Sequence, residues 1–69
     1  MTDGKSLREK IDSLGMKIVH LCEVTGIERG RMYRILGGDD CTASEITAIS
    51  NAIRLTKAER DKIFFFSKK

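Results

Sequence analysis

Three arginines and a tyrosine surround a glycine in the segment "GIERGRMYRIL", residues 26–36. The planar guanidinium fork of arginine matches the O6 and N7 acceptors of guanine and also the oxygens of a phosphate. No acid lies between Arg29 and Arg34, whereas every charged residue within 37–53 is acidic. The sharp change of sign predicts that the arginines form a separate surface for an anionic partner.

Apolar spacing predicts the helix that must position these side chains, over about residues 28–36. At 100° per residue, one side of this helix is apolar and buried, and consists of Met32, Ile35 and Leu36. Gly30 and Arg34 then point the opposite way, flanked by Arg31 and Tyr33. Glycine costs a helix about 1 kcal/mol relative to alanine, but its missing side chain allows the backbone to approach base edges closely. Gly37 is the expected C-terminal stop.

Two further helices are expected before this segment. Ser6 and Glu9 have the spacing of a capping box, which predicts a first helix from about residue 6 to Leu14, ending at Gly15. A second helix lies within "KIVHLCEVTG" and stops at Gly26. Its expected inner face consists of Ile18, Leu21, Cys22 and Thr25.

Two more helices are expected after the "GGDD" segment at residues 37–40. Thr42 and Glu45 form a capping box that starts a fourth helix at 42 or 43, ending near Arg54. Cys41 and Ile46 have the spacing of a hydrophobic staple. The expected buried face consists of Ile46, Ile49, Ala52 and Ile53. Thr56 and Glu59 form a third capping box that opens a fifth helix, and no period-2 alternation predicts a strand.

The composition of the chain limits the possible classes of protein. The 69 residues include no proline or tryptophan and are 41% hydrophobic, with a net charge of +3, which excludes collagen-like and disordered classes. No apolar run approaches a membrane span, and the N-terminus lacks the apolar core of a secretory signal. We expect a single domain over residues 1–69, soluble and cytoplasmic, with no membrane partner.

Metal binding and catalysis find little support in the sequence. His20, Cys22 and Cys41 lack zinc-finger spacing and a fourth ligand, so we expect a solvent-facing histidine and two cysteines that act as small hydrophobes. The "GGDD" segment is too short for a phosphate-binding P-loop and has no lysine. No catalytic set of residues is apparent. We therefore expect no enzyme activity, cofactor, metal or small-molecule substrate.

Residues 18–35 fit a helix-turn-helix unit, in which Gly26 supplies the turn and Ile27 fills the core after it. On these residues the chain resembles the Cro and phage-repressor (XRE-type) family, over about residues 6–66. The segment "TASEITAISNAIRLTKAERDKIFF" is similar to small phage and prophage regulators of Gram-positive bacteria. The resemblance implies an all-α, five-helix, lambda-repressor-like DNA-binding domain with a central motif at about residues 17–36. The chain departs from the family at Ile18, at Cys22 and in its acidic loop.

The resemblance implies that the second helix of the motif lies in the DNA major groove. The expected function is that of a sequence-specific transcriptional regulator, a Cro-like repressor that acts by occupying a double-stranded operator. The expected DNA-binding residues are Lys17, Glu28, Arg29, Gly30, Arg31, Tyr33 and Arg34. The alternative is a protein-interaction module, an antirepressor or adaptor that uses the acidic "GGDD" surface and the phenylalanines.

Three consecutive phenylalanines close the last expected helix, and they cover too much of its circumference for all to be buried. An exposed phenylalanine favours a protein partner, most simply a second copy of the chain. We therefore expect a homodimer through the C-terminal region, beside the apolar Ile53 and Leu55. The expected dimer-interface residues are Phe64, Phe65 and Phe66.

Overall fold

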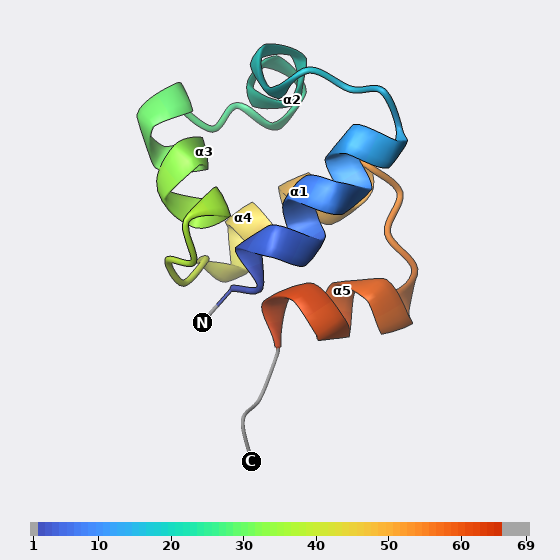
Figure 1. Cartoon of the computed structure of the whole chain (residues 1–69). Coiled ribbons are helices and arrows are strands. Elements are labelled where there is room, and N and C mark those ends of the chain that lie inside the picture. Colours follow the sequence, from blue (N-terminus) through green and yellow to red (C-terminus); the bar gives the residue numbers. More distant parts are fainter. Residues whose placement is uncertain (1, 66–69) are drawn as a thin grey trace.

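The computed structural model describes residues 2–65, which form five helices and no strand (Figure 1). The helices are α1 (Gly4–Ser13), α2 (Ile18–Thr25), α3 (Arg29–Leu36), α4 (Ala43–Ala52) and α5 (Lys57–Phe64). Helix α1 packs against α3 and α5, while α4 packs against α2 and α5. This arrangement confirms the expected all-α class with five short helices.

The core gathers apolar side chains from all five helices, as the periodicity predicted. The fully buried side chains are Leu7, Ile11, Leu21, Met32, Ile35, Ile49 and Ile53. Cys22, Ile63 and Phe64 complete the buried cluster, and the half-buried Leu36, Cys41 and Ile46 pack against it. The expected inner faces of α2, α3 and α4 are therefore confirmed, with Leu36 and Ile46 at their edges.

The start of α1 differs from the expectation. The helix begins at Gly4, with Asp3 as its N-cap, and Ser6 lies inside the first turn. The Asp3 carboxylate accepts from the Ser6 backbone N–H at 3.1 Å and from the Ser6 hydroxyl at 2.8 Å. The predicted Ser6–Glu9 capping box is therefore wrong, because an acid three residues upstream caps the helix instead.

The capping boxes of α4 and α5 are both present. Thr42 Oγ1 accepts from the Glu45 backbone N–H, and Glu45 Oε1 accepts from the Thr42 N–H at 2.9 Å. Thr56 and Glu59 repeat the same reciprocal pair. Helix α4 ends at Ala52 with Ile53 as its C-cap, close to the expected end near Arg54, and Arg54 takes a left-handed conformation with φ of 54°.

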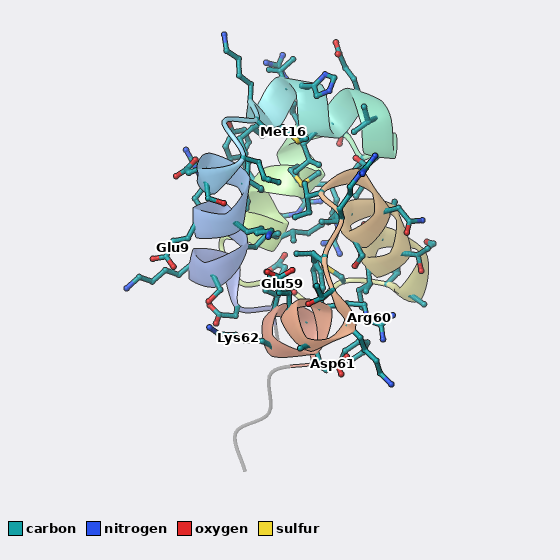
Figure 2. All side chains as sticks on the ribbon, turned by 90° about the vertical axis from the view of Figure 1, so that its right-hand side faces the viewer. Glu9, Met16, Glu59, Arg60, Asp61 and Lys62 are labelled. Atoms are coloured by element: carbon teal, nitrogen blue, oxygen red, sulfur yellow. The ribbon has the colours of Figure 1, made fainter. Side chains whose placement is uncertain are left out.

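Helices α1 and α5 are joined by an ion pair as well as by apolar contacts. The Lys10 ammonium donates to Glu59 Oε2 at 3.1 Å, and Figure 2 shows Glu59 on the side of α5 that faces α1.

In the part of the chain that the structure describes, no helix has the length and apolar character needed to cross a bilayer.

The N-terminal segment at Thr2 and Asp3 lies between the end of α3 and the end of α5. The Thr2 backbone N–H donates to the Gly38 carbonyl at 3.4 Å, and the Asp3 N–H donates to the Ile63 carbonyl at 2.7 Å. Gly4 lies against the last residue of α3, where a Cβ atom on Gly4 would overlap the carbonyl oxygen of Leu36. Glycine at this position therefore permits the close approach of α1 to α3.

We expect Gly4→Ala to lower the free energy of unfolding by about 2 kcal/mol or more, because the added methyl group meets backbone that has to shift. The matched control is Gly30→Ala, since a Cβ atom at Gly30 meets only the end of the Glu28 side chain at 3.8 Å. That substitution should raise stability by up to about 1 kcal/mol. Urea unfolding followed by circular dichroism measures both, and equal effects of the two substitutions would contradict the close contact at Gly4.

Candidate functional site

The connection between α2 and α3 is short and held by side-chain hydrogen bonds. Gly26 ends α2 in a left-handed conformation with φ of 76°, which glycine adopts without strain. Thr25 Oγ1 donates to the Leu21 carbonyl at 2.7 Å and accepts from the Ile27 N–H at 3.2 Å. Ile27 is half-buried against the core. These contacts fix the angle at which α3 leaves α2.

The outer face of α3 is open to solvent. Gly30, Tyr33 and Arg29 are exposed, and 63% of the Arg34 side chain is exposed. Met32 and Ile35 hold the opposite face in the core with no exposed surface. The helix therefore presents two arginines and a tyrosine around a glycine, whereas the helical geometry predicted that Arg31 would also flank this face.

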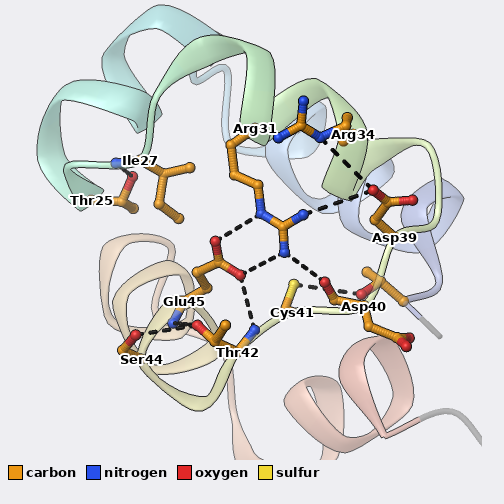
Figure 3. A network of polar contacts seen from close by, with 11 residues as sticks. Thr25, Ile27, Arg31, Arg34, Asp39, Asp40, Cys41, Thr42, Ser44 and Glu45 are labelled. Carbon is orange, nitrogen blue, oxygen red and sulfur yellow. Dashed lines mark hydrogen bonds and ion pairs between the residues drawn. The ribbon is translucent and has the colours of Figure 1, made fainter.

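Arg31 differs from the other two arginines of α3, because its guanidinium faces α4. Only 25% of its side chain is exposed. Its Nε donates to Glu45 Oε2 at 2.8 Å, and its Nη2 donates to Glu45 Oε1 at 2.9 Å and to the Asp40 carbonyl at 2.7 Å (Figure 3). Arg31 therefore joins α3 to the following loop and to the start of α4.

Sequence reasoning did not find the pairing of Arg31 with Glu45. The capping box explained Glu45 by its local contact with Thr42, and the two charged residues are too far apart in sequence for helical spacing to relate them. Their contact depends on how α4 packs beside α3. Only the tertiary structure shows that this arginine is already engaged.

The Arg31 guanidinium lowers the pKa of Glu45 from 4.5 to about 2, and the hydrogen bond from Thr42 adds to the effect against the opposing cost of burial. The same hydrogen bond raises the pKa of Arg31 above its ordinary value. A carboxylate whose pKa is depressed in the folded state stabilises the fold above its unfolded pKa. That stabilisation is lost as the pH falls from about 4.5 toward 2.

We therefore expect Glu45→Gln to lower the free energy of unfolding at pH 7 by about 2 kcal/mol and to flatten its decline between about pH 4.5 and 2. The glutamine carbonyl can still cap α4, so the change removes the negative charge and the second oxygen that accepts from Arg31. Chemical unfolding across this pH range measures the effect. Glu9→Gln serves as control, because Figure 2 shows Glu9 pointing away from its helix into solvent. If the free energy of unfolding fell in parallel with pH in the wild-type protein and in Glu45→Gln, the ion pair between Arg31 and Glu45 would not stabilise the fold as expected.

The acidic loop folds back over the last turn of α3. Gly37 is the C-cap of α3, which confirms the expected stop, and the following Gly38 adopts a left-handed conformation with φ of 110°. The Asp39 N–H then donates to the Arg34 carbonyl at 3.0 Å. The Asp39 carboxylate lies 3.9 Å from Arg34 Nε and 3.7 Å from Arg31 Nη1. The loop therefore places an acid beside two of the three arginines.

Lys17 and Glu28, the other two predicted site residues, lie at the N-caps of α2 and α3. Both residues are exposed, and neither side chain caps its own helix. Lys17 is therefore exposed to solvent at the start of α2. Glu28 lies beside Gly30, at the beginning of the exposed face of α3.

The C-terminal phenylalanines have different environments. Phe64 is 7% exposed and belongs to the core, so it offers little surface to a second copy of the chain. Phe65 is 55% exposed, and the Arg60 guanidinium lies 5.8 Å from its ring centroid. Phe66 lies outside the described residues. Among the residues described, the expected dimer surface is therefore reduced to Phe65.

His20 and the two cysteines do not come together. His20 is exposed and 3.9 Å from Glu23, whereas Cys22 is buried and Cys41 is half-buried. Burial raises the pKa of both thiols. Within residues 2–65, no group of three or more histidine, cysteine or acidic side chains is arranged to hold a metal ion.

No family model, curated protein or solved structure matches this chain. The function is therefore inferred from the geometry of α3 and of the loop that follows it.

Proposed function

We propose that this chain is a sequence-specific DNA-binding transcriptional regulator, with α2 and α3 as a helix-turn-helix unit and α3 as its recognition helix. The observation that carries the proposal is the open face of α3, where Arg29, Tyr33 and Arg34 surround the exposed Gly30. A helix fits the major groove when its exposed face can approach the bases. Gly30 allows that approach, and the neighbouring arginines provide donors for base edges and phosphates.

The exposed residues divide into two roles. Arg29 and Arg34 are proposed to contact bases, preferably guanine O6 and N7, and Tyr33 to contact a thymine methyl group or the sugar-phosphate backbone. Lys17 is proposed to bind a phosphate at the start of α2. Arg31 is assigned to holding α3 against α4, because Glu45 and the Asp40 carbonyl accept hydrogen bonds from its Nε and Nη2.

The finer assignment follows the resemblance of the sequence to Cro-like regulators. We propose a lambda-repressor-like domain that represses by occupying its operator as a homodimer. The exposed Phe65 supports a contact between two copies, since a large aromatic ring in water favours a partner.

We expect Arg34→Ala and Arg29→Ala each to weaken specific binding by about 1–3 kcal/mol if they contact bases bidentately. Lys17→Ala should weaken all duplexes alike and reduce the slope of log K against log salt by about 1, because it removes one phosphate contact. Gel shifts on a recognised duplex and on a scrambled duplex measure both effects. A uniform loss in all three variants would contradict the division into base-contacting and phosphate-contacting residues.

A gel shift of the wild-type protein on DNA from the neighbouring promoter region tests the proposal itself. Binding should weaken steeply as salt rises from about 50 to 200 mM, because phosphate contacts release counterions. The second candidate is a protein-interaction module, which the exposed Phe65 and Val24 favour. A chain that binds no DNA even at low salt would support that second candidate instead.

A further inference from the structure

Asp39 is an acid that lies beside Arg34, near the C-terminal end of the exposed face of α3. We propose that Asp39 is a specificity-determining residue, whose carboxylate holds Arg34 for contact with a base and disfavours binding to phosphate alone. This inference rests on the proposed DNA-binding function. It assigns a role to the acidic loop, which that function does not otherwise use.

Hydrogen bonds fix the backbone at Asp39 and at the residues before and after it. Its own N–H donates to the Arg34 carbonyl at 3.0 Å, and the preceding Gly38 carbonyl accepts from the Thr2 N–H at 3.4 Å. The carbonyl of the following Asp40 accepts from Arg31 Nη2 at 2.7 Å. Backbone contacts therefore anchor the loop, so the Asp39 carboxylate stays near Arg34 rather than sampling a wide volume.

The contact between Asp39 and Arg34 involves one edge of the guanidinium. The Asp39 Oδ2 atom lies 3.9 Å from Arg34 Nε, and a dashed line joins the two residues in Figure 3. The two terminal nitrogens of Arg34 remain available, and most of the side chain is exposed. A guanine edge needs two coplanar N–H donors. A carboxylate beside Nε limits the orientations of the Arg34 guanidinium. It leaves the two terminal nitrogens of that guanidinium free to contact a guanine.

The same carboxylate acts against binding that depends on phosphates alone. Non-specific affinity comes almost entirely from cations that neutralise phosphates and release counterions. Asp39 lies near both Arg31 and Arg34, so it offsets part of their positive charge and repels a phosphate that approaches them. A specific complex retains its base hydrogen bonds, and it loses less side-chain freedom because the nearby carboxylate already restricts the orientations of Arg34. The ratio of specific to non-specific affinity therefore rises.

Asp39→Asn tests this role, with Asp61→Asn as the matched control. Asp39 and Asp61 are 55% and 48% exposed, and Asp61 lies 3.6 Å from Arg60 on α5 (Figure 2). Each substitution raises the net charge by one. The probes are a duplex of about 20 bp, long enough for two half-sites, recovered from a randomised pool by the wild-type protein, and a scrambled duplex of equal length. Circular dichroism checks that both variants are folded.

We expect Asp39→Asn to bind the scrambled duplex about three- to fivefold more tightly than Asp61→Asn does. Its slope of log K against log salt should be steeper by about 1. Its affinity for the recovered duplex should stay within about twofold of that of Asp61→Asn, so the ratio of specific to non-specific affinity falls. Equal behaviour of the two variants, or an equal gain on both duplexes, would overturn the role of Asp39 while the DNA-binding function stands. A wild-type protein that recovers no duplex from the pool would overturn both.

Discussion

Gly30→Glu should abolish DNA binding while leaving the helical content nearly unchanged. Glutamate forms helices better than glycine, and the structure shows free space at this position, where an added Cβ would meet only the Glu28 side chain at 3.8 Å. The new carboxylate would point from the exposed face of α3 toward the phosphates and bases of a docked duplex. The loss of binding would therefore come from charge and position rather than from unfolding.

Ala58→Glu provides the control for Gly30→Glu. Ala58 is exposed on α5, at the end of the molecule opposite α2 in Figure 1, and the substitution changes the net charge by the same amount. We expect this variant to keep nearly all of its operator affinity. Circular dichroism and gel shifts at one fixed salt concentration compare the two proteins. If Gly30→Glu kept its affinity, the exposed face of α3 would not be the DNA-binding surface.

Phe65→Ser should disrupt a homodimer and weaken operator binding about a hundredfold or more, because the second copy then no longer binds as part of one complex. A single copy presents one recognition helix, whereas two copies related by a two-fold axis present their helices about 34 Å apart. Phe65 is the exposed phenylalanine among the residues described, at the C-cap of α5. Sedimentation at rising concentration, with and without a recovered duplex, measures the assembly.

Leu14→Ser is the control for the dimer, since Leu14 is also a large exposed apolar residue but lies at the C-cap of α1. We expect its sedimentation and DNA binding to match those of the wild-type protein. A wild-type protein that stays monomeric and binds a palindromic site without cooperativity would contradict the dimer. Phe65 would then be a surface aromatic residue in contact with Arg60.

Local signals in the sequence were sufficient for most of the fold. The capping boxes at Thr42 and Thr56 depend on residues three positions apart, and both are present. Apolar spacing identified the buried faces of α2 and α3 for the same reason, since the period of a helix is a local property. The existence of all five helices followed from such signals.

The errors in the expected fold have physical causes that local spacing does not contain. Ser6 and Glu9 fit a capping box, but Asp3 competes for the same N–H group and forms an earlier start. Gly37 does end α3 as expected, but the left-handed conformation of the following Gly38 depends on the contacts of the loop. The close approach of Gly4 to Leu36 likewise joins residues that are distant in sequence.

The candidate site was predicted as a face but not as a set of contacts. Helical geometry placed Gly30, Tyr33 and Arg34 on the exposed side of α3, where the structure has them. The same geometry could not reveal that Arg31 binds Glu45, because that contact depends on the packing of α4. Nor could it show that Asp39 lies beside Arg34, which depends on the turn at Gly38.

Selection from a randomised duplex pool by the wild-type protein is the most direct test of sequence-specific DNA binding through α3. We expect enrichment of a two-fold symmetric sequence whose half-sites are about 34 Å apart, one turn of the duplex. The Gly30→Glu protein, carried through the same rounds in parallel, should enrich nothing. Failure of the wild-type protein to enrich any sequence over the starting pool, or equal enrichment by Gly30→Glu, would contradict recognition of DNA by this helix.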